Sequence, residues 1–160
     1  MEIKKYLKET GIEFKLHKHP PVYTCEEMEE YSKDIKGIHS KNLFIKNRKS
    51  KEYYLVILPA KKNFNFKKFE ELLNEKLKFA NENDLKHFLG LTSGSVSPFG
   101  LINDEEHKVE ILIDKEVWNS DFVSFHPNIN TETLELNGKD FQKYIKSLKN
   151  KLTLVDINEK

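Results

Sequence analysis

Residues 91–104 read LTSGSVSPFGLIND and form the most distinctive segment of this 160-residue sequence. The segment contains two of the six glycines in the chain, and its centre is a Gly-x-x-x-Pro loop made of Gly94, Ser95, Val96, Ser97 and Pro98. Glycine allows a ligand or another backbone to approach closely, and proline fixes its own φ and favours extended geometry before it. Such a loop can direct several backbone N–H groups towards a carbonyl or a developing oxyanion. An isolated Gly-x-x-x-Pro is more often an ordinary turn, so the loop alone does not decide the function.

On both sides of this loop, strand-like and helix-like segments alternate. Residues 41–45 and the apolar run at 53–58 predict the two strands of a hairpin, the second of them buried on both faces. Further strands are predicted at 14–17, 109–113, 122–125 and 132–136, while residues 152–157 form either a last edge strand or a tail. Apolar periodicity and capping residues predict helices at 2–10, 24–31, 66–77, 84–89 (with Asn83 as N-cap) and 138–149. This interleaving indicates an α/β fold with a mixed central sheet flanked by helices.

Composition narrows the class of protein. We expect residues 1–160 to form a single domain, because this length buries a real core without disulfides. The lone cysteine, Cys25, excludes an intramolecular disulfide and a cysteine-cluster metal site. No apolar run resembles a signal peptide or a membrane span, so we expect a cytoplasmic protein without a membrane partner. The net charge of +1 does not by itself indicate a nucleic-acid partner. A surface that binds nucleic acid would have to be a local basic patch.

Three blocks of sequence carry a family resemblance. The segment at 91–104, together with SKNLF at 40–44 and FHPN at 125–128, resembles the prolyl-tRNA-editing family of the YbaK/ProX type. The resemblance extends from His17 to Leu136 and is strongest to free-standing members that deacylate mischarged alanyl-tRNA(Pro). It implies the fold of the YbaK-like editing domain associated with prolyl-tRNA synthetase. Ser93 departs from the family pattern, where many relatives have proline, and this departure affects only local rigidity.

The resemblance assigns candidate roles to single residues. Lys41 falls where the family has its functional lysine, and its ammonium can pair with the terminal phosphate or with the oxyanion of ester hydrolysis. Asn42 can bind substrate or satisfy a turn. His126 matches the family's histidine near the aminoacyl group, and the alternative is a structural histidine.

Two further segments complete the candidate site. Residues 19–24, HPPVYT, resemble the family's pocket-forming segment, with Val22 and Thr24 as candidates for the pocket wall. In the loop, we expect Gly94 to act through its backbone. The other candidate substrate contacts there are Ser95, Val96, Ser97 and Pro98.

No metal site or cofactor is predicted from the histidines. His17 and His19 lie two residues apart, on one face of a strand, and a third ligand would have to come from far away. We expect His39, His87 and His107 at the surface.

The chemistry implied by the resemblance is hydrolysis without a covalent intermediate. The nucleophile-elbow pattern Gly-x-Ser-x-Gly is absent, and water would attack the ester, assisted by the terminal ribose hydroxyl of the tRNA. The implied partner is the acceptor end of tRNA(Pro) with its aminoacyl ester, with or without recruitment by prolyl-tRNA synthetase. Two alternatives stay open: deacylation of cysteinyl-tRNA(Pro), and a non-catalytic module that binds tRNA or an aminoacyl ligand.

Overall fold

The most deeply buried strand is β3 (Tyr53–Pro59), all of whose residues are buried. It forms an antiparallel hairpin with β2 (Ile38–Asn47), which begins three residues earlier than the sequence predicts. The computed structural model describes residues 2–21, 37–127 and 131–157 of the chain. The predicted hairpin, with a second strand that is covered on both faces, is therefore confirmed.

The strands form one mixed sheet of eight, in the order β1-β7-β6-β2-β3-β5-β8, with β4 also paired to β2. The β2–β6, β3–β5 and β5–β8 pairs are parallel, and the other pairs are antiparallel. The α/β fold with a mixed central sheet is thus confirmed. The remaining strands are β1 (Lys15–Lys18), β4 (Leu77–Phe79), β5 (Val109–Asp114), β6 (Phe122–Phe125), β7 (Glu132–Asn137) and β8 (Leu152–Val155).

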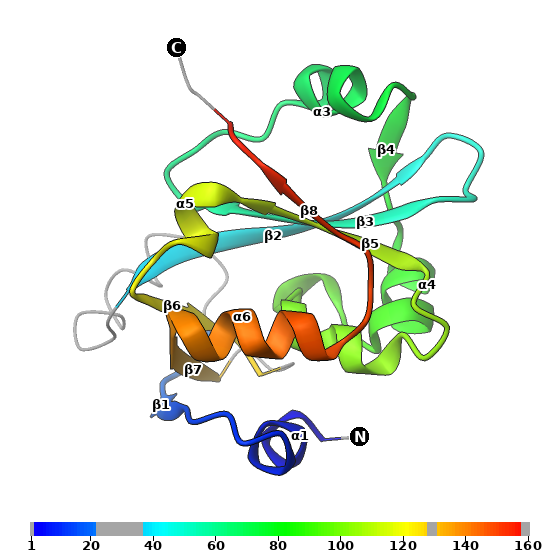
Figure 1. Cartoon of the computed structure of the whole chain (residues 1–160). Helices are drawn as coiled ribbons and strands as arrows, with labels where there is room; N and C mark the ends of the chain where they lie inside the picture. The colour runs from blue at the N-terminus through cyan, green and yellow to red at the C-terminus, as the bar shows by residue number, and fades with distance from the viewer. Residues whose placement is uncertain (1, 22–36, 128–130, 158–160) are drawn as a thin grey trace.

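Helices cover the two faces of this sheet. Figure 1 shows α3 (Phe66–Leu73) on one side of the strands and α6 (Gly138–Ser147) on the other. The other helices are α1 (Ile3–Glu9), α4 (Glu82–Asp84), α5 (Lys115–Trp118), the π-helix η1 (Leu85–Leu89) and the 3₁₀ helices η2 (Ser93–Ser95) and η3 (Pro98–Asn103).

Each face has its own hydrophobic cluster. The larger one includes Phe99, Phe125 and Phe141 and lies on the α6 side, where the hydroxyl of Tyr144 donates to the Pro98 carbonyl at 2.8 Å. The smaller one lies under α3 and is centred on Phe69. Alternation along β2 therefore directs successive side chains into different cores.

Several predicted boundaries are wrong. The helix predicted to reach residue 77 ends at Leu73, because Asn74 adopts left-handed backbone geometry, and Leu77 begins β4 instead. Asn81, and not Asn83, caps the next helix through a capping box with Asp84. The short helix α5 was not predicted. The helix predicted at 24–31 lies outside the described residues.

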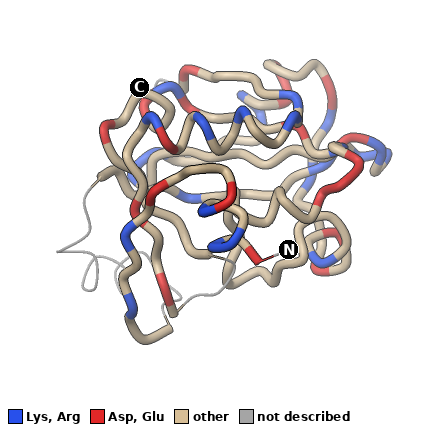
Figure 2. The backbone as a smooth tube through the Cα atoms, turned by 60° about the horizontal axis from the view of Figure 1, so that its bottom comes forward, with Lys and Arg blue, Asp and Glu red and all other residues tan. Residues whose placement is uncertain are grey.

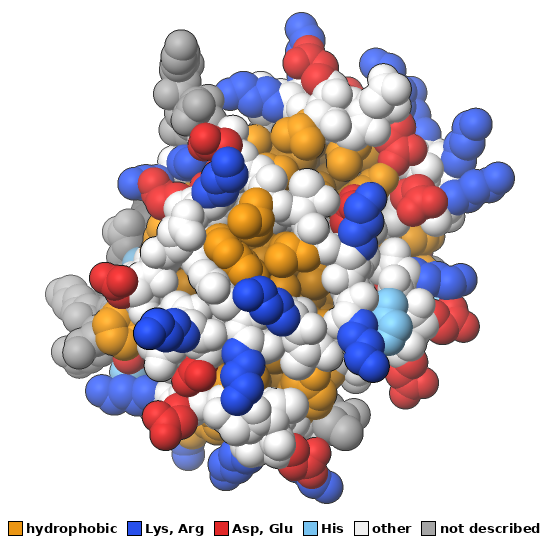
Figure 3. Space-filling model, viewed as in Figure 1, with side chains coloured by type: hydrophobic (Ala, Val, Ile, Leu, Met, Phe, Trp, Pro, Cys, Tyr) orange, Lys and Arg blue, Asp and Glu red, His pale blue; other side chains and the backbone are white. Residues whose placement is uncertain are grey.

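The C-terminal segment forms a strand rather than a tail. Among the described strands, β8 pairs with β5 alone, and Leu154 is partly exposed at this edge of the sheet. Figure 3 shows apolar side chains on this face among basic and acidic ones. Figure 2 shows basic and acidic residues interspersed along a chain whose residues are mostly uncharged. Any surface of one charge sign is therefore local.

Candidate functional site

The sheet opens at the edge of β2 that faces away from β3. The β2–β6 ladder covers only Ile38 and His39, and the β2–β4 ladder begins at Ile45. Among the described strands, residues 40–43 of β2 thus pair with β3 alone.

Backbone directions follow from the hairpin register. The Ala60 N–H donates to the His39 carbonyl, and the Asn47 N–H donates to the Glu52 carbonyl. Odd-numbered residues of β2 therefore direct their backbone groups towards β3. Ser40 and Asn42 direct theirs to the opposite edge, where β6 ends. The backbone groups of Asn42 are therefore presented in the opening between β2 and β6, beyond the last pair of the β2–β6 ladder at His39 and Ser124.

A small cavity of about 50 Å³ lies at this opening. It has room for a few water molecules or a small side chain, since one water needs about 10–15 Å³ in this measure. Its walls come from β2, from the end of β6 and from β7. The lining residues are His39, Ser40, Asn42, Ser124, Phe125, His126 and Thr133.

Two polar atoms at this cavity have no hydrogen-bond partner among the described residues. The hydroxyl oxygen of Ser40 and the carboxamide oxygen of Asn42 are buried and make no hydrogen bond within the described part of the chain. An unpaired buried polar group costs about 1–3 kcal/mol, so such atoms usually have a partner. A ligand that supplies hydrogen-bond donors would satisfy both, and this is the clearest sign of a binding site here.

His126 is held in one tautomer at the cavity wall. Its Nδ1 lies 2.9 Å from the Glu132 carbonyl, which can only accept, so Nδ1 carries the proton and donates. Nε2 of the neutral ring is then left as an acceptor. Burial lowers the pKa of His126 below its ordinary value, the hydrogen bond to Glu132 acts in the opposite direction, and His19 nearby lowers it further. His126 is therefore neutral at neutral pH.

His17 and His19 lie on one face, as predicted, and both contact β7. Nε2 of His17 lies 3.2 Å from a carboxylate oxygen of Glu135, and Nε2 of His19 lies 2.8 Å from the hydroxyl of Thr133. The His19 ring also packs edge-on against His126, with 5.9 Å between the ring centroids. These contacts link β1 to the cavity wall.

Lys41 lies beside the cavity but is not among its described lining residues. Strand alternation places Lys41 on the same face as Leu43, which packs under α3, whereas Asn42 shares the other face with Phe44. The ammonium of Lys41 has no ion pair or hydrogen bond to any residue that the structure describes. A half-buried lysine with an unpaired charge is suited to an anionic ligand.

The Gly-x-x-x-Pro loop lies one layer behind the cavity. Its Pro98 leads into Phe99, whose ring packs edge-on against Phe125 of the cavity wall at 5.9 Å. Ser97 is fully buried, and its hydroxyl accepts from the Phe99 N–H. None of the described lining residues comes from 91–104.

The remaining loop residues differ in exposure. Ser95 is buried and its hydroxyl lies 3.4 Å from that of Thr92, while Val96 packs on the larger core. Gly94 is exposed, and a Cβ added there would meet no atom within 4 Å. The backbone at Gly94 is therefore open to a ligand.

The structure brings Asn42 and His126 together, two predicted site residues that are distant in sequence. Val22 and Thr24 lie outside the described residues. His39, expected at the surface, is half-buried and lines the cavity, while His87 and His107 are exposed as predicted.

Sequence reasoning also missed other lining residues from three strands, namely Ser40, Ser124, Phe125 and Thr133. Ser40 and Phe125 stand at the first positions of the SKNLF and FHPN blocks, which was the available signal. Nothing in the sequence marks Thr133.

The described residues contain neither a metal site nor a membrane-spanning helix. Among residues 2–21, 37–127 and 131–157, no group of three His, Cys, Asp or Glu side chains is placed to hold a metal ion. Within the same ranges, none of the helices has the length and apolar character needed to cross a membrane.

Comparison with known proteins gives a consistent result. The sequence model of the family described as "Aminoacyl-tRNA editing domain" matches residues 19–144. The chain is 36% identical over 152 residues to "Prolyl-tRNA editing protein ProX" of Acetoanaerobium sticklandii, covering 94% of this chain and 93% of the relative. It is 31% identical over 151 residues to "Prolyl-tRNA synthetase associated domain-containing protein 1" of Mus musculus, covering 91% and 89%.

Solved structures share the fold at lower identity. A candidate trans-editing enzyme for prolyl tRNA synthetase superposes with a TM-score of 0.77 at 16% identity, covering 99% of this chain and 96% of that one. A hypothetical protein superposes with a TM-score of 0.76 at 18% identity, covering 99% and 100%. These two likenesses concern the fold alone.

Proposed function

The chain belongs to the YbaK/ProX family of aminoacyl-tRNA editing domains, which are deacylases, and we propose that it hydrolyses the ester of mischarged tRNA(Pro), chiefly alanyl-tRNA(Pro). The observation that carries the proposal is the small cavity with its two unpaired buried oxygens, on Ser40 and Asn42. An aminoacyl ester offers an ammonium group, whose three N–H donors suit these acceptors.

The size of the cavity supports a small aminoacyl group. A synthetase pocket built for proline cannot strongly reject alanine, because each missing methylene is worth only about 1–3 kcal/mol. A second site that admits alanine and excludes proline by size then removes the error. About 50 Å³ between β2 and β6 fits such a sieve. By the resemblance of residues 19–24, Val22 and Thr24 remain proposed contacts to the aminoacyl group.

The proposed reaction is a direct hydrolysis. Water attacks the ester carbonyl carbon, the carbon–oxygen bond to the ribose breaks, and the ribose oxygen leaves with a proton, which gives free alanine and uncharged tRNA. The ribose hydroxyl of the terminal nucleotide assists the water. The family's chemistry therefore needs no serine nucleophile, and chelation of metal should leave the rate unchanged.

Within this reaction, Asn42 accepts from the aminoacyl ammonium, and His126 offers neutral Nε2 close to the ester. Gly94, whose backbone is open, donates its N–H to the developing oxyanion. Ser95, Ser97 and Pro98, which are buried, and Val96, which packs on the larger core, hold that loop in place.

Lys41 reaches the substrate from the other face of β2. This placement supports a contact with the terminal phosphate more than one with the oxyanion. The reaction belongs in the cytoplasm, where charged tRNA is used, and recruitment by prolyl-tRNA synthetase is compatible with it.

Single-turnover deacylation of tRNA(Pro) charged separately with alanine and cysteine tests the proposal. We expect alanyl-tRNA(Pro) to be hydrolysed faster than cysteinyl-tRNA(Pro), because the thiol adds volume. The reverse order would assign the cysteine reaction instead. Binding of both substrates without hydrolysis would show a non-catalytic module.

A further inference from the structure

A cluster of phenylalanines lies at the surface between α3 and β4. The rings of Phe64 and Phe66 are 4.8 Å apart, those of Phe66 and Phe79 are 4.8 Å apart, and those of Phe64 and Phe79 are 6.0 Å apart. Phe64 and Phe66 are half-buried, and Phe79 is 54% exposed, the largest exposure among the large apolar side chains that the structure describes. We call Phe64, Phe66 and Phe79 the aromatic platform.

Lysines flank the three phenylalanines of the platform along the chain. Residues 60–69 read AKKNFNFKKF and residues 76–81 read KLKFAN, so the two segments that supply the rings carry lysines and no acidic residue. Lys61 pairs with Glu116 of α5, and Lys62 pairs with Asp114 of β5. Lys67, Lys76 and Lys78 have no ion pair to any residue that the structure describes, whereas Glu70, Glu71, Glu75 and Glu82 lie on the same stretch of chain, so the charge around the exposed rings is mixed with a small basic excess.

The platform shares a face of the sheet with Lys41. Phe79 lies opposite Ile45 in the β2–β4 ladder, and Leu43 packs against the cluster that holds Phe64 and Phe66. Lys41 follows on the same face, four residues from Ile45, or about 13 Å along a strand. That distance corresponds to a few stacked bases at about 3.4 Å each.

We propose that the aromatic platform binds the unpaired bases next to the aminoacylated nucleotide by stacking. Exposed aromatic rings beside lysines are how proteins commonly hold single-stranded nucleic acid, because every base has an apolar face and every nucleotide a phosphate. The single-stranded 3′ end of the RNA then runs from Phe79 past Lys41 to the opening between β2 and β6. The identity of this RNA as a tRNA end rests on the proposed function.

Binding of an uncharged RNA hairpin tests this surface without any hydrolysis. The probe is a fluorescent hairpin with a single-stranded CCA 3′ end, compared with the same hairpin made blunt, at one fixed salt concentration. We expect Phe79→Ala to weaken binding of the CCA hairpin about 5- to 150-fold, which corresponds to the loss of one stacked base at about 1–3 kcal/mol. Binding of the blunt hairpin should be unchanged.

Two further variants sharpen the comparison. Phe79→Tyr keeps an aromatic face and should bind the CCA hairpin as wild type does. Leu72→Ala removes an apolar side chain of similar exposure (47%) that lies outside the platform, and it should have no effect. Equal binding of the CCA hairpin by wild type and a folded Phe79→Ala would overturn the proposal and assign the surface to a protein partner. So would equal weakening of the blunt hairpin.

The outcomes separate this inference from the proposed function. If Phe79→Ala deacylates the substrate and binds the CCA hairpin as wild type does, only the proposed role of the aromatic platform is contradicted. Conversely, CCA binding that depends on Phe79, in a protein that hydrolyses no aminoacyl ester, contradicts only the proposed reaction.

Discussion

Lys41 is the side chain whose loss we expect to reduce activity most. Its ammonium has no partner among the described residues and is presented beside the cavity. Lys41→Ala should lower kcat/KM for alanyl-tRNA(Pro) about 100-fold or more, the scale for losing one charge-stabilising group. A rise in KM would show a phosphate contact, and a fall in kcat would show oxyanion stabilisation.

Lys41→Arg is the matched variant, because it keeps the charge and changes the geometry. Steady-state kinetics of the three proteins give the comparison. Because the placement of Lys41 favours a phosphate contact, we expect arginine to recover most of the binding that the alanine variant loses. An alanine variant with unchanged kcat/KM would remove Lys41 from the site.

Gly94 tests whether the loop contacts substrate. The φ of Gly94 is not in the left-handed region and no atom lies within 4 Å of an added Cβ, so a side chain there would not strain the backbone, and it would intrude only on a bound substrate. Gly94→Ala should therefore melt as wild type does and still lose turnover, because the methyl group occupies the space that substrate needs. Thermal melting and single-turnover kinetics check both parts.

Gly100, the other glycine of residues 91–104, differs from Gly94 because it has no room for a side chain. A Cβ at Gly100 would lie 2.6 Å from the side chain of Leu91 and 2.9 Å from the Leu89 carbonyl, so Gly100→Ala should destabilise the fold by about 1–3 kcal/mol. Full turnover in Gly94→Ala would mean that the loop has no contact with substrate.

The lowered pKa of His126 should make the free energy of unfolding depend on pH. Its pKa is lowered by burial in the folded protein, whereas the unfolded chain titrates near the ordinary value of about 6.5. Below that pH the unfolded state binds a proton that the folded state does not, so the free energy of unfolding should fall as the pH is lowered. Denaturant unfolding at pH 7.5 and about pH 5.5 measures this slope for wild type and His126→Gln.

His126→Gln has no imidazole at this position. Its free energy of unfolding should therefore fall less than that of wild type between pH 7.5 and about pH 5.5. Equal slopes for the two proteins would show that the folded pKa of His126 is not lowered.

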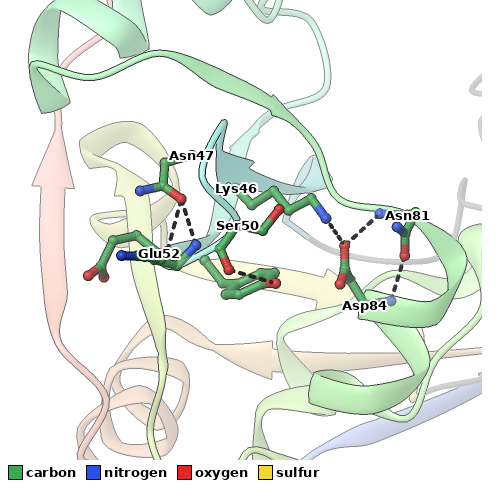
Figure 4. Close-up of polar contacts among 8 residues, drawn as sticks. Lys46, Asn47, Ser50, Glu52, Asn81 and Asp84 are labelled. Carbon is green, nitrogen blue, oxygen red and sulfur yellow. Dashed lines mark hydrogen bonds and ion pairs between the residues drawn. The ribbon is translucent and has the colours of Figure 1, made fainter.

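A buried ion pair joins two secondary-structure elements, β2 and α4. Nζ of Lys46 lies 2.6 Å from Asp84, and both side chains are largely buried (Figure 4). Burial alone would raise the pKa of Asp84, but hydrogen bonds from Lys46 and the Asn81 N–H lower it below its ordinary value. Lys46→Met should therefore cost about 3–5 kcal/mol, because it leaves a buried carboxylate without its cation.

The double variant Lys46→Met with Asp84→Asn removes that charge and keeps an acceptor for the capping box. It should recover a large part of the loss in denaturant unfolding. A double variant no more stable than Lys46→Met would show that the uncompensated charge is not the cause.

Local sequence predicted most elements, because their signals are local. The apolar run at 53–58 became the fully buried β3, and the stripe of Phe141, Tyr144 and Ile145 became α6. Errors arose where two signals competed: Asn81 and Asn83 are both capping residues, and Asp84 three residues after Asn81 decides the cap.

At the scale of the whole molecule, the order of strands could not be read from the sequence. The parallel β2–β6 contact joins residues more than 80 positions apart and creates the cavity beside it. Asn42 and His126 were found through their sequence blocks, whereas Thr133 and His39 enter the site only because the strands meet there.

The central claim, a site that edits by size, is tested most directly by comparing alanyl-tRNA(Pro) with prolyl-tRNA(Pro). The two substrates share the tRNA and differ only in the aminoacyl group that must enter the cavity. Single-turnover deacylation by the wild-type protein should be fast for the alanyl ester and close to the uncatalysed rate for the prolyl ester. Hydrolysis of the prolyl ester as fast as the alanyl ester would contradict the account.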